Sequence, residues 1–497
     1  MRFGAVIVLL LAAVTAALGQ EDSPAITAED RIVVVAPHPD DEVLGAGGII
    51  QQACAAGAEV HVVYLTNGDH NQFAFKLYRL RLHLGPIQYL FFGNLRQREA
   101  IAATGILGLS PDQLTFLGFP DYGALAIWQD YWRERTPFRS DATLSNAVPY
   151  VGAYEFGQRY TPENATADFV ELFRRWRPTR VFVTHPADTN PDHRAAANFV
   201  RLATLEISAE QAPPVICYYV IHFGRWPVPY HYHPDMELKP PRQLLDDGDW
   251  YSIPLTPEQT ERKYEAIIKN RTELTTREYY LVSFARANEI FATIDTLPVP
   301  VVPAGTIVNW KKAVRSRVIG FGAADSAYRP DVERLFSAEY AAMELEETAY
   351  VRQGDDLIAQ VTLRNRLGKR ANVHLLLYGY RQGEDFAAMP KIQINITPVG
   401  TVHVYDGRRR IKTSDVTVTS VSNHLIVRLP LWLLGERRPD YLFTATRASL
   451  GEVAADDTAW HLFSLSNGPE ILHTMRPSPS GAEAGTPVHK RPTTIGK

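Results

Sequence analysis

The sequence predicts an α/β fold with a mostly parallel sheet and flanking helices, followed by a C-terminal antiparallel β-sandwich domain. Two strand-like runs predict the parallel sheet, residues 31–35 and 180–184. Each run ends in a polar loop rich in His and Asp, and a helix-like stretch follows each loop, as is typical of parallel sheets. Short, often alternating apolar segments after residue 337 predict the sandwich.

The loop after the first strand is dense in side chains that can do chemistry. It contains His38, Asp40, Asp41 and Glu42 and runs into a glycine-rich helix start at residues 45–48. Open α/β sheets place their ligands at this edge. His38 and Asp41 can approach one divalent metal ion while Asp40 stays free as a base. The three acids would equally suit the first turn of a helix, where each stabilises by about 0.3–1 kcal/mol.

The loop after the second strand decides between these two interpretations. It runs from His185 to His193 and precedes a helical stretch at residues 194–205. If the two strands are parallel neighbours, His193 completes a site begun by His38 and Asp41. Two histidines and one carboxylate leave a coordination position open for water. The sequence therefore predicts a metal site, with His185 as a candidate cap of its own loop.

Further motifs make the chain similar to a known family over about residues 31–293. They are Thr66-Asn67-Gly68-Asp69, Arg96-Gln97-Arg98-Glu99-Ala100, Phe116-Leu117-Gly118-Phe119-Pro120-Asp121, Asn190-Pro191-Asp192-His193, and the stretch from Lys263 to Phe291 with Tyr280-Leu281 and Glu289-Ile290-Phe291. Together with the first loop they resemble the LmbE-like or PIG-L-type zinc deacetylases, which remove acetyl groups from N-acetylglucosamine-type sugars. The resemblance implies a Rossmann-like sheet and a bound Zn²⁺.

The resemblance also implies a role for each matching residue. Two of these residues have a purely structural alternative: Arg96 can pair with Glu99 one helical turn on, and Asp121 can cap the turn before Gly123. The implied zinc ligands are His38, Asp41 and His193, the implied general base is Asp40, and the implied contacts to sugar hydroxyls are Arg96 and Asp121.

One position departs from the family pattern. Asn190 stands three residues before the last implied ligand, where the family usually has a histidine that polarises or donates a proton. An asparagine can donate a hydrogen bond to an oxyanion but cannot deliver a proton at neutral pH. Either zinc and Asn190 share the electrophilic work while another group protonates the leaving amine, or activity is reduced. His222, in an expected strand at residues 215–223, is the candidate acid, and a histidine satisfied within that strand is the alternative.

These parts predict an exported zinc-dependent amidohydrolase (an N-deacetylase) that acts on an N-acetylated sugar or glycoconjugate. A zinc-bound water, with its pKa lowered toward about 7, loses a proton to Asp40 and attacks the acetamide carbonyl. Two alternatives stay open: a carbohydrate-binding protein with weakened catalysis, for which Asn190 is the sign, and a non-haem iron oxygenase built on the same triad. The retained Asp40 and the parallel scaffold speak against the oxygenase.

Composition and the N-terminus indicate the class of protein and its destination. The 497 residues carry a net charge of −4 with no basic run, so a nucleic acid is not an expected partner. An apolar stretch at residues 5–18 after Met1-Arg2 predicts a signal peptide cut near Gln20, and hence a secreted or periplasmic protein without an integral span after cleavage. The two cysteines, Cys54 and Cys217, are expected to be core residues rather than a disulfide framework. Nothing in the sequence indicates an oligomeric state.

Composition changes along the chain define five expected segments. An aromatic-rich insert at residues 122–162 is interpreted as a substrate wall or a partly buried flap, with the wall slightly favoured. In the sandwich, Trp432 and Trp460 are candidate sugar platforms, and bracing of the first domain is the expected role. The segments are a signal peptide at 1–19, the deacetylase-like domain at 20–296, a proline-rich linker or bridging segment at 297–336, the β-sandwich at 337–472, and a disordered tail at 473–497.

Overall fold

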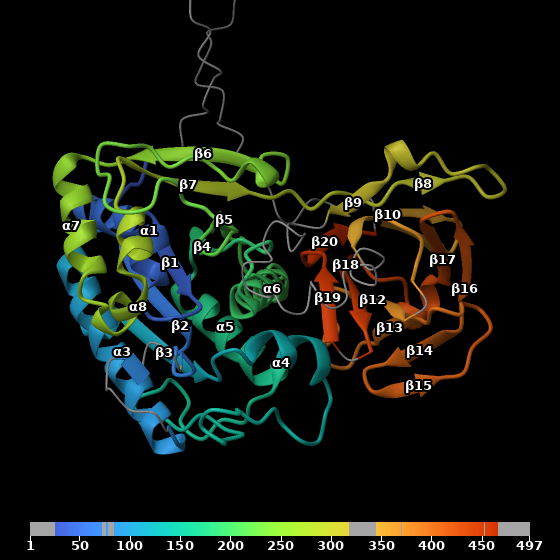
Figure 1. Ribbon diagram of the computed structural model, residues 1–497, viewed down its shortest axis with the longest axis horizontal. Helices are drawn as coiled ribbons and strands as arrows, with labels where there is room; N and C mark the ends of the chain where they lie inside the picture. Colours follow the sequence, from blue (N-terminus) through green and yellow to red (C-terminus); the bar gives the residue numbers. More distant parts are fainter. Residues whose placement is uncertain are drawn as a thin grey trace, which may run out of the picture.

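The computed structural model describes residues 25–71, 76–77, 84–317, 344–368, 370–451 and 453–465 (Figure 1). The predicted signal peptide and the predicted tail lie outside these ranges. None of the helices within them is long and apolar enough to cross a bilayer.

The first domain is built on a seven-stranded sheet in the order β3-β2-β1-β4-β5-β7-β6. The five strands from β3 to β5 pair in parallel, and β7 lies antiparallel between β5 and β6. This arrangement confirms the predicted fold class. The strands are β1 (Arg31–Ala36), β2 (Glu59–Thr66), β3 (Leu114–Phe119), β4 (Arg180–Thr184), β5 (Val215–Tyr219), β6 (Asp249–Pro254) and β7 (Asn288–Thr293).

Helices cover both faces of this sheet, which explains the unbroken apolar run of β1. Its alternate residues enter two different cores: Ile32 and Val34 face one layer of helices, and Val33 and Val35 face the other. The first layer contains α1 (Asp41–Ala56), α3 (Pro86–Leu107), α7 (Pro257–Ile267) and α8 (Arg271–Leu281), and the second contains α4 (Ala124–Asp130), α5 (Pro162–Trp176) and α6 (Pro191–Ile207). Short 3₁₀ turns are η1 (Pro111–Gln113), η2 (Arg242–Leu244), η3 (Val282–Phe284), η4 (Trp310–Lys312) and η6 (Leu431–Leu434).

The central pair of strands brings the two His- and Asp-rich loops together. β1 and β4 are parallel neighbours, with Ile32 opposite Arg180 and Val35 opposite Val183. Both strands therefore end at the same edge of the sheet, and the loops that follow them meet there. The predicted adjacency of the two loops is confirmed.

The second domain is a β-sandwich of two sheets. One sheet has the order β16-β17-β11-β10-β8 with β9 added on β10, and the other has the order β15-β14-β13-β12-β18-β19 with β20 added on β18. Pairing is antiparallel except between β8 and β10. The strands are β8 (Val301–Val302), β9 (Val314–Arg317), β10 (Leu345–Gln353), β11 (Asp356–Leu363), β12 (Ala371–Tyr380), β13 (Lys391–Ile396), β14 (Val402–Asp406), β15 (Arg409–Ile411), β16 (Thr417–Val421), β17 (His424–Pro430), β18 (Tyr441–Leu450), β19 (Val453–Asp457) and β20 (His461–Ser464). The described part of the predicted linker thus supplies β8 and β9 to this domain.

Strand β12 shows how the sandwich is fixed to the first domain. Leu375 and Leu377 point into the core between the two sandwich sheets, whereas Leu376 and Tyr378 point the other way and join the core of the first domain. Successive side chains of a strand face opposite sides of the sheet, so an apolar strand can serve two cores. The two domains therefore share a continuous apolar interface.

Trp128 of α4 lies at the centre of this interface. Its side chain is fully buried, and its ring lies within 5.3–5.8 Å, between ring centroids, of Phe199 in the first domain and of Phe443 and Trp460 in the second. The interpretation of the aromatic insert as a substrate wall is wrong for its four buried members, which pack inside the protein. Those members are Trp128, Trp132, Tyr150 and Tyr160. Trp128 and Trp132 cover the apolar face of the sandwich, whereas Tyr150 and Tyr160 lie against β3 of the first domain.

The two candidate tryptophan platforms of the sandwich differ in exposure. Trp460 is 1% exposed and packs against Trp128, so its interpretation as a sugar platform is wrong. Trp432 in η6 is 56% exposed. Trp460 instead serves the bracing role expected of the domain.

Replacing Trp128 with alanine is expected to lower the free energy of unfolding by about 3–5 kcal/mol, because the change opens a cavity in a core shared by two domains. Urea unfolding followed by circular dichroism measures the effect. Trp432→Ala is the matched control and is expected to change stability by less than about 0.5 kcal/mol, because that ring faces solvent. Equal losses in the two variants would contradict the interface described above.

Candidate functional site

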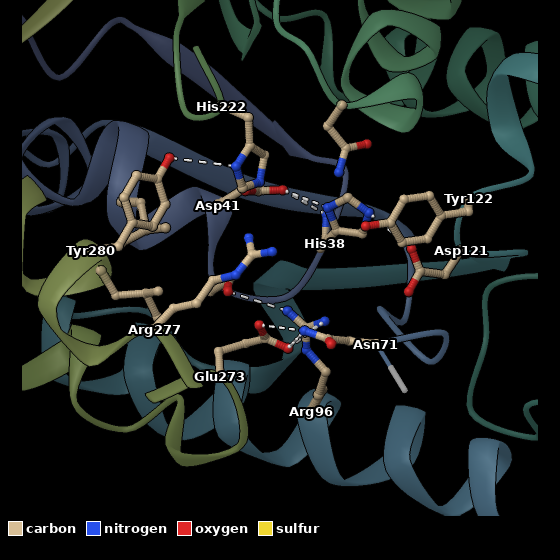
Figure 2. A pocket seen from close by; sticks show the side chains of 14 residues that line it. His38, Asp41, Asn71, Arg96, Asp121, Tyr122, His222, Glu273, Arg277 and Tyr280 are labelled. Carbon is tan, nitrogen blue, oxygen red and sulfur yellow. Dashed lines mark hydrogen bonds and ion pairs between the residues drawn. The ribbon is translucent and has the colours of Figure 1, made fainter. Parts of the chain in front are cut away.

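A polar pocket opens where the loops after β1 and β4 meet, and α8 forms its opposite wall (Figure 2). Its volume is about 550 Å³, part of which is open solvent. Ligand pockets of open α/β sheets occupy this edge. The residues that line it are His38, Asp40, Asp41, Leu44, Asn71, Arg96, Asp121, Tyr122, Asn190, His222, Glu273, Arg277, Tyr280 and Leu281.

Three predicted metal ligands converge on one point at the floor of the site. Nδ1 of His38 lies 3.1 Å from Oδ2 of Asp41 and 3.2 Å from Nε2 of His193, and that Nε2 lies 3.1 Å from the same Oδ2. Ligands of a tetrahedral ion with bonds of about 2.0–2.1 Å lie about 3.3 Å apart. The triangle therefore has the size that a divalent metal ion requires. Asp41 and His193 are 1% and 0% exposed.

The outer nitrogens of both histidines face carboxylates. Nε2 of His38 lies 3.2 Å from Asp121 and 3.3 Å from Asp192, and Nδ1 of His193 lies 3.1 Å from Asp188. Such partners fix the tautomer and the orientation of metal-binding imidazoles, leaving the inner nitrogen as the ligand. The donor set and its supports thus fit a bound ion.

The protonation of the ion-free triangle reflects the same carboxylates. Burial disfavours an imidazolium, but Asp188 and Asp41 outweigh it and raise the pKa of His193 to about 9. The pKa of His38 is raised well above its ordinary value, since Asp121, Asp192 and Asp41 together overcome its burial. Burial likewise opposes ionisation of Asp41, and the two histidines hold its pKa well below the ordinary range. In the ion-free site, protons on His38 and His193 therefore supply the positive charge that a bound metal ion would bring.

Asp40 is held away from the triangle by a strained backbone. Its φ of 134° lies in a region that side chains rarely adopt, at a typical cost of about 1–3 kcal/mol. The Asp40 N–H donates to the buried carboxylate of Glu42 at 3.0 Å, and the Asp40 carbonyl accepts from the first turn of α1. Burial raises the pKa of the Asp40 carboxyl well above its ordinary value, and the Arg96 guanidinium opposes that rise.

Arg96 anchors this part of the pocket. Its guanidinium lies 3.2 Å from Asp40 and 3.2 Å from Glu273 and donates to the carbonyls of Gly68 and Pro39 at 2.9 and 2.7 Å. Gly68 has a φ of +59°, and a Cβ there would lie 2.1 Å from the guanidinium. The glycine of the Thr-Asn-Gly turn therefore makes room for Arg96. The contact of Arg96 with a sugar hydroxyl stays a prediction, whereas its contact with the predicted base is observed.

The other predicted residues also line the pocket. Asp121 accepts from the His70 N–H at 2.7 Å in addition to facing His38, and its pKa is lowered to about 2 because His38 and Arg96 outweigh its burial. Oδ1 of Asn190 accepts from the Asp192 N–H at 2.9 Å and so caps α6. His222 lies in the loop after β5, and not within a strand as expected, because β5 ends at Tyr219.

His222 faces the metal triangle from the side of α8. Its ring centroid is 5.0 Å from that of His193, and its Nδ1 is 3.4 Å from Oη of Tyr280. Burial and the neighbouring His193 lower the pKa of His222 to about 3. Its imidazole is therefore neutral at pH 7 and can act there as a hydrogen-bond donor or acceptor.

Comparison with known proteins agrees with this geometry. A family model described as GlcNAc-PI de-N-acetylase, PIG-L, matches residues 33–204. Residues 33–204 are a PIG-L domain. The match includes the loop after β1, the loop after β4 and all three residues of the donor triangle.

Relatives of the PIG-L domain include curated bacterial enzymes. A 1D-myo-inositol 2-acetamido-2-deoxy-alpha-D-glucopyranoside deacetylase of Rhodococcus opacus is 30% identical over 190 residues, which are 37% of this chain and 56% of that protein. The enzyme of that name from Mycolicibacterium smegmatis is 36% identical over 124 residues, 24% of this chain and 39% of its own. The chain thus spans little more than half of the first relative's length.

A solved structure also aligns with the chain. The N,N'-diacetylchitobiose deacetylase of Pyrococcus horikoshii aligns with 53% of this chain and 84% of its own, at 17% identity and a TM-score of 0.34.

Sequence reasoning missed the carboxylates that support the PIG-L triangle and the wall formed by α8. Asp188 and Asp192 lie inside the second loop motif, but no pattern distinguishes an outer support from a ligand. Glu273 and Arg277 are four residues apart, a spacing that places both on one helix face. That spacing was the one sequence signal for a polar helix face. It did not show that α8 reaches the pocket, because tertiary packing places the helix there.

Metal binding by the PIG-L domain is expected to release at least one proton per ion near neutral pH, because His193 must lose the proton that its pKa of about 9 retains. Because the pKa of His193 is raised, the affinity of the site for the metal ion rises with pH, by about tenfold per pH unit for each displaced proton. The affinity levels off above that pKa. Calorimetry in buffers with different heats of ionisation counts the protons. A binding heat that does not change with the buffer would contradict this account.

Proposed function

We propose that the protein is a zinc-dependent N-deacetylase that removes the acetyl group from an N-acetylated sugar or glycoconjugate. The observation that carries the proposal is the buried triangle of His38, Asp41 and His193 with an additional carboxylate, Asp40, held beside it by Arg96. A hydrolytic metal site needs both the ligand triangle and a separate base, whereas an iron oxygenase does not need the base. The names of the curated relatives support the acetamido sugar as substrate.

His38, Asp41 and His193 would hold the zinc ion. When bound, zinc supplies Lewis-acid chemistry, lowering the pKa of water toward about 7 and polarising an acyl oxygen. The two histidines fit that task because their outer partners, Asp121 and Asp192 at His38 and Asp188 at His193, orient the ligand nitrogens before substrate arrives.

Asp40 moves the proton. It removes a proton from the attacking water as the new carbon–oxygen bond forms at the acetamide carbonyl. When the carbon–nitrogen bond breaks, the leaving nitrogen needs one proton, which the now protonated Asp40 carries. The products are acetic acid, which keeps the water's second proton, and the free amine. Transfer of that proton to the amine leaves acetate and an ammonium group, so atoms and charge balance without a separate acid. Arg96 keeps the Asp40 carboxylate in place through both transfers.

Asn190 and His222 are proposed to bind the developing oxyanion or the departing amine. Asn190 uses its Oδ1 to cap α6, so its amide nitrogen is the atom left for the pocket. His222, predicted as a proton donor, is neutral at pH 7 and suits hydrogen bonding better than proton delivery. Because Asp40 carries the proton and these two side chains only form hydrogen bonds, an asparagine is sufficient at position 190.

Asp40→Asn is expected to reduce acetate release by about a hundred- to ten-thousand-fold while zinc content stays unchanged. Asparagine tolerates a positive φ almost as well as aspartate, so the variant removes the base without forcing the backbone to move. Acetate is measured after incubation with N-acetylglucosamine, chitooligosaccharides and acetylated glycoconjugates, before and after chelation. Asp415→Asn, at an exposed loop position, is the matched control and is expected to match the wild type.

Two results would count against the proposal. Release that survives Asp40→Asn would remove the assigned base. Zinc-loaded protein that binds these sugars but releases no acetate from any of them would instead support the carbohydrate-binding alternative.

Export is a further part of the proposal, supported by the apolar stretch at residues 5–18. The full chain, expressed in a bacterium with a periplasm, is expected in the periplasmic fraction with a mature N-terminus near Gln20. Fractionation and N-terminal sequencing measure this. A chain that still begins at Met1 in the cytoplasmic fraction would contradict it.

A further inference from the structure

Helix α6 carries the ligand His193 in its first turn and is unusually enclosed. Every residue from Asp192 to Leu205 is buried, including two arginines, Arg194 and Arg201, which are 4% and 3% exposed. Arginines are rarely buried this deeply without partners. The first domain encloses α6 through β1, β4, α4 and α5, and the second domain closes the other side, where its strands β18, β19 and β20 lie beside α6 (Figure 1). Arg201, for example, donates to the Trp460 carbonyl at 2.9 Å.

Arg194 connects the sandwich to the metal triangle. On one side its Nη1 lies 3.7 Å from Oδ2 of Asp457, at the end of β19. On the other side its Nε donates to the Asp188 carbonyl at 2.8 Å. A buried guanidinium needs a countercharge, and Asp457 supplies one from the other domain. The position of Arg194 is therefore set jointly by the two domains.

Asp188 is the next element of this connection. Its Oδ2 lies 3.1 Å from Nδ1 of His193 and accepts from the N–H groups of Ile221 and His222 at 3.0 and 2.9 Å. Its Oδ1 accepts from the Asn190 N–H at 2.9 Å. A displacement of Asp188 would thus reach a metal ligand and two pocket residues at once.

We propose that Asp457 is a positioning residue for the metal site: through Arg194 it holds Asp188, and Asp188 holds His193 in its ligand orientation. The sandwich is then part of the metal site as well as a brace. The inference rests on the metal ligands of the proposed function, but it does not depend on the reaction.

The test compares two interdomain carboxylates. Asp457→Asn removes the carboxylate that pairs with Arg194 from the second domain. Asp406→Asn is the matched control, because Asp406 forms an ion pair with Arg133 across the same interface but has no contact with the metal ligands among the described residues. Zinc affinity is measured by competition with a chelator, and ligand geometry by the visible absorption of the cobalt-substituted protein.

Asp457→Asn is expected to weaken zinc binding about tenfold, the lower end of the range for outer partners of metal ligands, and to alter the cobalt spectrum. Asp406→Asn is expected to leave both unchanged. Asp457→Glu, which restores the charge, is expected to recover most of the affinity. Wild-type affinity and an unchanged cobalt spectrum in Asp457→Asn would overturn the proposal.

A double-mutant cycle checks the route and guards against a folding defect. Asp457 also accepts from Arg447 at 2.9 Å, so its loss affects the sandwich as well. If Arg194 transmits the effect, the double variant Arg194→Lys with Asp457→Asn loses no more zinc affinity than whichever single variant loses more. Additive losses would overturn the proposed route. If zinc binding depends on Asp457 but the protein releases no acetate, the proposed deacetylase function is refuted and the positioning role of Asp457 is supported.

Discussion

The parallel pairing of β1 with β4 is the constraint on which the rest of the site depends. These strands lie about 150 residues apart in the sequence, and their register ends both at one edge of the sheet. His38 and Asp41 follow the first strand, and His193 follows the second. Without that pairing neither loop contains enough ligands for a metal ion. The cores on both faces of the sheet hold the register, since a shift of one residue would turn every apolar side chain of β1 to the wrong layer.

Buried charge is the cost of this arrangement, and its compensation explains most of the surrounding residues. Carboxylates flank both histidines, and Arg96 lies between Asp40 and Glu273. Asp40 faces Arg96, Asp41 faces the two histidines, and Asp188 faces His193 and three backbone N–H groups, as buried ions require. These contacts are in place without any ligand, which suits a catalyst that must hold a base at a fixed distance from an ion.

Much of this site could be predicted from local sequence, because ligands and base lie in two short loops directly after strands. The strands of the first sheet were also recognisable locally, as apolar runs that end in polar loops. What could not be predicted depends on packing between distant segments. The aromatic insert gave no sign that Trp128 would face another domain, since an apolar side chain does not encode its partner. Arg194 looked like an ordinary helix residue, and only the position of Asp457 gives it a role.

The central claim is that the inner nitrogens of His38 and His193, together with Asp41, bind the ion. His38 also faces Asp121 and Asp192 through its other nitrogen, and this second group of donor atoms is compact enough to hold a metal. A crystal structure of the zinc-loaded protein, with anomalous scattering recorded at the zinc edge, decides between the two positions. The account predicts one zinc ion between His38, Asp41 and His193. An ion bound instead by Asp121 and Asp192 would contradict it.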